Sequence, residues 1–137
     1  MARRFRSFGH TADTGLMAYG KDLPEAFANA AYGMFSIIAD LRAVKETESR
    51  VVQVTGNDRE GLLFEWLNRL LYFFDAEMLL LKRFDIEKFE DKTLKATCYG
   101  EKFDPSRHKI KAGVKSATYY LLQVDKEKNR VRVIFDI

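Results

Sequence analysis

The 137-residue sequence is long enough for one domain with a buried core, and its hydrophobic fraction of 47% excludes a disordered chain. No apolar run approaches the roughly 20 residues of a membrane-spanning helix, and no secretory signal follows the basic start. A soluble cytoplasmic protein with no membrane partner is therefore predicted. The single cysteine, Cys98, excludes an internal disulfide and any zinc site built from several thiolates.

The formal net charge of +3 is small, but the basic residues gather near both ends of the sequence. Three arginines lie within residues 3–6, and the late group comprises Lys102, Arg107, Lys109, Lys111 and Lys115. This distribution suits a nucleic acid or an acidic partner, although a charge run most often forms a solvated face. His108, inside the late group, is predicted to be solvated, with contact to RNA as the alternative.

Two helices are predicted, each with a clear start. Asp22 and Glu25 form a capping-box pattern around Pro24, and apolar residues at helical spacing then extend to about Asp40. The second helix begins at residues 57–60 in the same manner and ends near residues 75–77. Its apolar residues cover more than one stripe, which predicts packing on more than one side.

Strands are predicted around the helices from β-branched and alternating patterns. They cover residues 16–20, 51–55, 83–89, 94–100, 119–125 and 130–137, with hairpin turns at 90–92 and 126–129. A short helical turn is expected at residues 104–108. The order of elements predicts a single α+β domain over residues 1–137, with two helices packed on a mostly antiparallel or mixed sheet.

Several familiar catalytic motifs are missing from the sequence. It has no GxxxxGK[ST] or GxGxxG phosphate-binding loop and no GxSxG nucleophile elbow. Cys98 lies in the middle of a predicted strand, where a small buried hydrophobic residue is a better interpretation than a nucleophile.

The stretch at residues 8–15 places His10 and Asp13 between two glycines. Asp136 is the penultimate residue of the sequence, so its carboxylate lies next to the carbonyl oxygen and terminal carboxylate of Ile137. Hard divalent cations require several oxygens in one place, which Asp13 and Asp136 would supply if the first and last strands are neighbours. An Asx-turn and a frayed terminus are the structural alternatives.

Asp75 and Glu77 close the second predicted helix, where the helix dipole disfavours carboxylates. Their position indicates a local reason: a bound cation, a basic partner, or a helix that has already ended.

Taken together and in order, several short motifs resemble the archease family over essentially the whole chain. They are His10–Leu16, Ala18–Gly20, Leu23–Phe27, Phe74–Glu77, Gly100–Pro105, Val114–Tyr119 and Phe135–Ile137. The sequence departs from the family pattern at Tyr120 and Phe74, where the family commonly has histidine.

The resemblance implies an accessory protein and not an enzyme. Archeases activate the tRNA-splicing ligase, which joins RNA ends bearing a 2′,3′-cyclic phosphate or 3′-phosphate and a 5′-hydroxyl. They promote guanylylation of the ligase histidine and multiple turnover, and they broaden its nucleotide use. The family binds a divalent cation, assigned as calcium, and the resemblance places its ligands at Asp13, Asp136 and a backbone oxygen of Ile137. His10, Asp75 and Glu77 would support the site or dock the partner.

Two other functions remain open from the sequence. The second hypothesis is a binding module. The basic segment from Lys102 to Lys115 favours direct binding of RNA such as tRNA, and the family has also been associated with a chaperone role for tRNA methyltransferases. A metal-assisted hydrolase using His10 and Asp13 is the third hypothesis.

Overall fold

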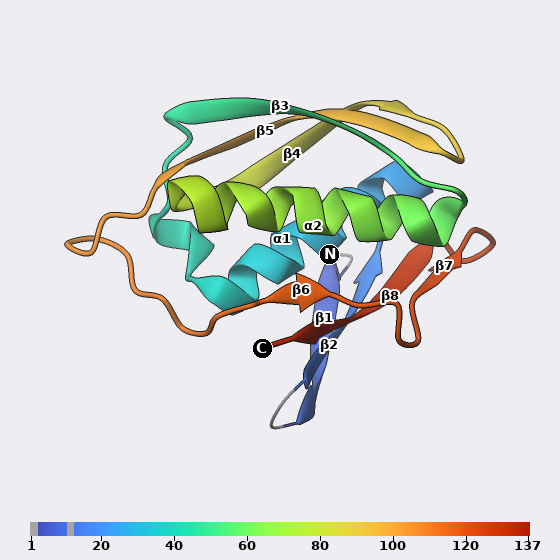
Figure 1. Ribbon diagram of the computed structural model, residues 1–137, viewed down its shortest axis with the longest axis horizontal. Helices are drawn as coiled ribbons and strands as arrows, with labels where there is room; N and C mark the ends of the chain where they lie inside the picture. Colours follow the sequence, from blue (N-terminus) through green and yellow to red (C-terminus); the bar gives the residue numbers. More distant parts are fainter. Residues whose placement is uncertain (1–2, 11–12) are drawn as a thin grey trace.

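The computed structural model describes residues 3–10 and 13–137, which form two helices and two antiparallel sheets (Figure 1). The first sheet has the order β1 (Phe5–His10), β2 (Asp13–Tyr19), β8 (Arg130–Asp136) and β6 (Ser116–Ala117), and β7 (Gln123–Asp125) also pairs with β8. The second has the order β3 (Glu48–Thr55), β5 (Thr93–Lys102) and β4 (Leu79–Phe89). The predicted α+β class is confirmed, although the strands form two sheets and not one.

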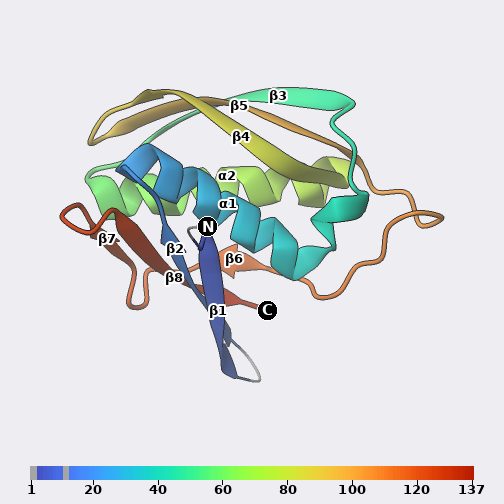
Figure 2. The same ribbon diagram turned by 180° about the vertical axis from the view of Figure 1, so that it is seen from behind.

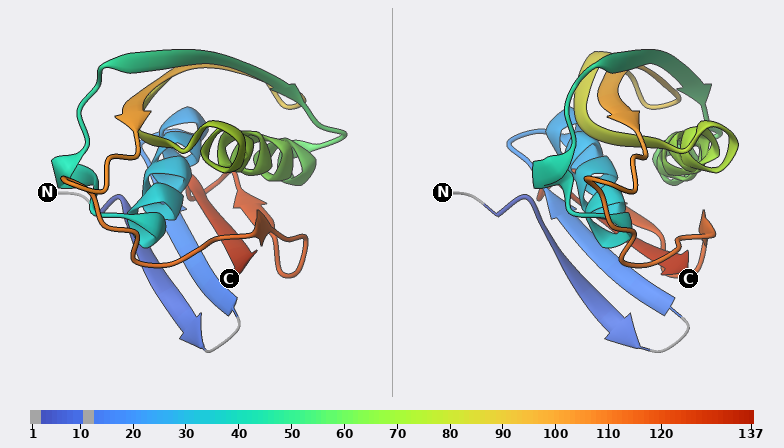
Figure 3. Two further views of the ribbon diagram at one scale, coloured as in Figure 1. Left: turned by 60° about the vertical axis from the view of Figure 1, so that its left-hand side comes forward. Right: turned by 90° about the vertical axis from the view of Figure 1, so that its left-hand side faces the viewer.

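The helices α1 (Leu23–Ile38) and α2 (Arg59–Glu77) lie between the two sheets, as the side views in Figure 3 show. The indole Nε1–H of Trp66 in α2 donates to the Phe27 carbonyl of α1 at 3.0 Å, in a fully buried position. Because α2 contacts strands of both sheets, the prediction that it packs on more than one side is confirmed. Within the described residues, no helix is long and apolar enough to cross a membrane.

Side-chain caps define where both helices begin. Asp22 accepts a hydrogen bond from the Glu25 amide at 2.9 Å, and the Glu25 carboxylate accepts one from the Lys21 amide at 2.9 Å. Asp58 accepts from the Gly61 amide at 2.7 Å. The first helix ends at Ile38, two residues before the predicted limit, and a short 3-10 turn (Leu41–Ala43) follows.

Two strand predictions were incomplete or wrong. The strand β1 was not predicted, and residues 119–122 form a turn in which Leu121 has a φ of 54°. Only Gln123–Asp125 of the predicted strand at 119–125 pairs with β8. A left-handed backbone at Leu121 interrupts the extended conformation that the residue types favour.

Cys98 is fully buried in β5, as predicted. Burial raises the pKa of its thiol to about 12, so the thiolate nucleophile is not formed near neutral pH.

Gly100 allows β4 and β5 to approach closely beside an irregularity in their register. A Cβ atom at Gly100 would lie 1.8 Å from the backbone oxygen of Leu80. We expect Gly100→Ala to lower the free energy of unfolding by about 2 kcal/mol, because the strands must separate locally. Gly113→Ala is the matched control, since a Cβ there meets no atom within 4 Å. Urea denaturation of both variants checks this, and equal midpoints would contradict it.

Candidate metal centre

Asp13 and Asp136 are direct partners in the antiparallel register of β2 and β8. Figure 3 shows the end of β8 beside the start of β2. Side chains of directly opposed residues lie on the same face of a sheet, with Cβ atoms about 4.5–5.5 Å apart. The structure therefore brings the two carboxylates from opposite ends of the sequence to one place.

The carboxylate pair lies on the outer face of the first sheet. Val133 and Phe135 alternate with Asp136 along β8 and are buried against the helices, so Asp136 points the other way. Asp13 and Asp136 are both exposed, and neither carboxylate has a hydrogen bond or ion pair within the described chain. Like charges directly opposed in a sheet destabilise it, and a cation between the two carboxylates would offset this repulsion.

Neighbouring residues add oxygen atoms to this end of the sheet. Ser116 of β6 is the register partner of Asp136 on its other side, and no sequence pattern pointed to it because β6 has only two residues. The Asp136 carbonyl accepts from the Lys115 amide at 2.8 Å, which fixes the backbone before Ile137. Ile137 is half-buried and packs against the core.

His10 is the register partner of Asp13 on β1, so its backbone belongs to the same row across the sheet. The side chain of His10, together with Thr11 and Ala12, lies outside the described residues. Among those that are described, no three His, Cys, Asp or Glu side chains converge as a metal-binding group. A cation here would thus use two carboxylates with backbone, hydroxyl or water oxygens, a donor set that fits calcium or magnesium.

Asp75 and Glu77 do not join this row. Glu77 forms an ion pair with Arg50 of β3 at 2.5 Å, and this hydrogen bond lowers the pKa of the Glu77 carboxyl. Asp75 is exposed near the same end of α2. For Glu77, the local reason predicted for a carboxylate at a helix end is a basic partner within the chain.

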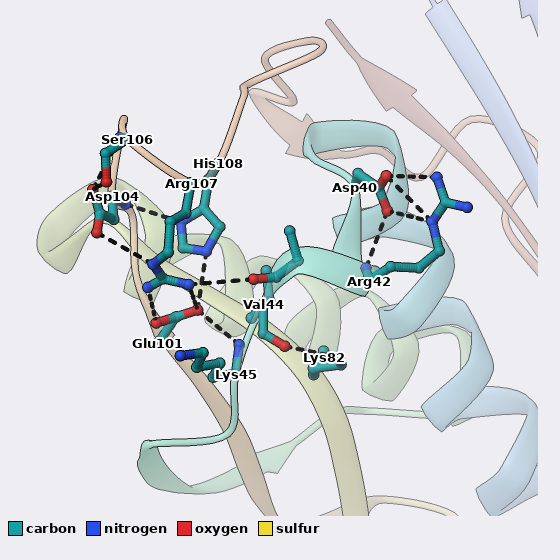
Figure 4. Close-up of polar contacts among 11 residues, drawn as sticks. Asp40, Arg42, Val44, Lys45, Lys82, Glu101, Asp104, Ser106, Arg107 and His108 are labelled. Carbon is teal, nitrogen blue, oxygen red and sulfur yellow. Dashed lines mark hydrogen bonds and ion pairs between the residues drawn. The ribbon is translucent and has the colours of Figure 1, made fainter.

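A second polar cluster surrounds Glu101, whose side chain is 8% exposed (Figure 4). Its carboxylate accepts hydrogen bonds from the Lys45 amide at 2.7 Å and from the Arg107 guanidinium at 2.5 and 3.0 Å. These donors, Arg107 first, hold the pKa of Glu101 at about 2. The cluster ties the segment that follows β5 to the segment that precedes β3.

The prediction that His108 is solvated was wrong, because its side chain is 1% exposed. The Asp104 amide donates a hydrogen bond to His108 Nδ1 at 2.9 Å, so Nε2 carries the ring hydrogen and donates to Glu101 at 3.0 Å. The pair of His108 and Glu101 could not be predicted, because a run of charged residues in a sequence does not show which of its side chains are buried.

The sequence was compared with protein-family models and with known proteins. A family model described as the archease protein family matches residues 5–137. The chain belongs to the archease family. A protein named archease from Sulfurisphaera tokodaii is 39% identical over 93% of this chain and 92% of its own length. One from Saccharolobus islandicus is 42% identical over 97% and 96%, respectively.

Solved structures agree with this family assignment. The solution structure of Methanobacterium thermoautotrophicum protein 1598 is 35% identical, with a TM-score of 0.78, and the match covers 98% of this chain and 99% of that one. A Thermotoga maritima crystal structure, described as an archease and possible chaperone, covers 96% of both chains with a TM-score of 0.63. At 20% identity, the latter likeness shows the archease fold alone. The curated relatives carry the name archease and not that of an enzyme class.

Proposed function

We propose that this protein is a non-enzymatic activator of a tRNA-splicing RNA ligase, which supports ligase guanylylation and multiple turnover through a divalent cation held at Asp13, Asp136 and Ile137. The in-register pairing of Asp13 with Asp136 carries this proposal. Membership of the archease family supports it, because the ordered motifs of the sequence resemble those of ligase activators.

The residues of the chain would act by presenting oxygens at a fixed spacing. The register of β2 and β8 sets the separation of the two carboxylates, and the Lys115 amide holds the backbone at Asp136. The exposure of both carboxylates leaves one side of the site open to a partner. A bound calcium ion, which accepts six to eight oxygen ligands, would offer its remaining positions to oxygens of the ligase.

Multiple-turnover ligation tests the proposal. The purified protein is mixed with the ligase of its source organism, GTP, a divalent metal and an RNA with 2′,3′-cyclic phosphate and 5′-hydroxyl ends. We expect product to exceed one equivalent of ligase only when the protein is present, with a matching rise in guanylylated ligase. An active ligase whose turnover and guanylylation do not change would contradict the proposal.

A chaperone role for tRNA-modifying enzymes is the second candidate. The turn between β6 and β7 exposes three large side chains, with Tyr119 60%, Tyr120 67% and Leu121 49% exposed. Clustered exposed apolar residues are typical of protein contact sites. Protection of a tRNA-modifying enzyme from aggregation, with no stimulation of the ligase, would favour this candidate.

A further inference from the structure

A groove follows the outer side of α1, between β2 and β4. Figure 2 shows this side of the molecule, with β4 above α1 and the strands β1 and β2 below it. Two hollows of about 560 Å³ and 460 Å³ share the lining residues Arg4, Lys21, Glu25 and Asn29, so they adjoin each other along α1. We call the two together the α1 groove; volumes of several hundred cubic ångströms are typical of ligand sites.

The lining of the α1 groove is strongly basic. It contains five basic and two acidic side chains, an excess equal to the formal net charge of +3 of the whole chain. One of the acids, Glu25, is engaged by the Lys21 amide as part of the α1 cap. Arg83 is neutralised by Asp85 and by Glu46, so the positive charge that could attract an anion lies with Arg3, Arg4, Lys21 and Lys82.

Three of these cations differ from most arginines of the protein. Within residues 3–10 and 13–137, the side chains of Arg3, Arg4 and Lys21 form no ion pair with a carboxylate. Six arginines that follow α1 in the sequence do form such pairs: Arg42, Arg50, Arg59, Arg83, Arg107 and Arg130. Arg83 therefore has carboxylate partners although it lines the groove, whereas Arg3, Arg4 and Lys21 remain available to an anion.

Aromatic side chains accompany these free cations. The guanidinium of Arg4 lies 4.5 Å from the centre of the Tyr32 ring, which gives a planar cation on an aromatic face. Tyr19 lines the adjoining hollow, and its hydroxyl accepts from Arg6 Nε at 3.2 Å. Basic grooves with aromatic faces are typical of proteins that bind single-stranded nucleic acids, because phosphates contact the cations and bases stack.

We propose that the α1 groove binds the phosphodiester backbone of a single nucleic-acid strand. An extended open groove favours a chain over a single nucleotide, and planar guanidinium and aromatic faces favour a nucleic acid over an acidic peptide. The site is separate from the carboxylate pair, since Tyr19 and Asp13 lie at opposite ends of β2, about 20 Å apart at the usual rise per residue. A negative result for ligase activation would therefore not contradict nucleic-acid binding at the groove.

Fluorescence anisotropy with a labelled single-stranded RNA tests the proposal, and the triple variant Arg3→Gln, Arg4→Gln, Lys21→Gln removes the free cations. We expect its affinity to fall at least about tenfold at about 50 mM salt, with a salt dependence about 2 units shallower for three lost phosphate contacts. The control variant Lys92→Gln, Lys95→Gln, Lys126→Gln removes equal charge from exposed positions outside the groove, and it should bind as the unchanged protein does.

Further binding measurements distinguish the possible ligands of the groove. A DNA strand of the same sequence shows whether RNA is preferred. Tight binding of either strand supports the proposal that the groove binds a single nucleic-acid strand. No binding by the unchanged protein, equal losses in both triple variants, or equal affinity for GTP or an oligoglutamate peptide would each overturn the proposal. Circular dichroism confirms folding, and Lys21→Gln alone, with an expected loss of about threefold, replaces the triple variant if that variant does not fold.

Discussion

Asp136→Asn is expected to lower calcium affinity at least about 100-fold and to abolish cation-dependent stimulation of the ligase, while the fold remains intact. Loss of groups that merely support a metal ligand often costs 10–100-fold in affinity, and removal of one of two carboxylates should cost at least as much. The fold should survive because the Asp136 carboxylate is exposed and has no protein partner within the described chain. Asp13→Asn should behave in the same way, because the two residues face each other in the register.

Isothermal titration with calcium, followed by the turnover assay on the same samples, checks this expectation. Glu127→Gln is a suitable control, because Glu127 is an exposed carboxylate in the turn between β7 and β8 and forms no ion pair in the described residues. Ser116→Ala should have a smaller effect, since a neutral hydroxyl contributes less than a charged ligand. Calcium affinity unchanged in both aspartate variants would remove the proposed centre.

Glu101→Gln is expected to lower the free energy of unfolding by about 3 kcal/mol, because it leaves three donors, among them the buried His108, without their charged acceptor. The Glu101 carboxylate serves Arg107, His108 and the Lys45 amide at once. An amide has one acceptor oxygen in place of two and brings hydrogens that face the same donors. For a chain of 137 residues this loss corresponds to a fall in Tm of roughly 10 °C.

The same residue should make the protein sensitive to acid. The pKa of Glu101 is lowered from 4.5 to about 2 in the folded protein, so its charged form stabilises the fold above about pH 4.5. As pH falls from about 4.5 to about 2, that contribution is lost. After allowance for screening at the partly exposed Arg107, it amounts to about 2 kcal/mol. Urea titrations at several pH values should show this slope, and Glu101→Gln should remove it.

Asp40 provides a matched control with the opposite exposure (Figure 4). Its pKa is also lowered to about 2, by hydrogen bonds from Arg42, but its side chain is 48% exposed and that of Arg42 is 88% exposed. Because an exposed ion pair contributes little, Asp40→Asn should leave both the stability and its acid dependence nearly unchanged. If Asp40→Asn and Glu101→Gln had equal effects, burial would not be the source of the stabilisation.

The helices could be predicted closely because their signals are local. Asp22 and Asp58 accept from the amide three residues later, and that spacing is visible in any sequence. The strands β1 and β6 could not be predicted, since each depends on pairing with distant residues. The two residues of β6 form a strand because β8 lies beside them.

The candidate site shows the same division between local and distant information. Oxygen-rich positions at Asp13 and Asp136 could be identified from residue types, but their adjacency depends on the register of β2 and β8. His108 was misjudged because its partner, Glu101, turns inward from the end of β5. A basic segment has the same composition whether its members face water or a buried carboxylate.

The position of β8 has a consequence for how the protein is made. This strand comes last in the described chain, yet it lies inside the first sheet, with β2 on one side and β6 and β7 on the other. Until residues 130–136 have left the ribosome, β2 keeps one unpaired edge, and the short strands β6 and β7 lack their partner. Sheets closed by such distant segments form slowly and leave edges open to aggregation. The carboxylate pair is completed in the same step, so only a chain that has finished this sheet can present it.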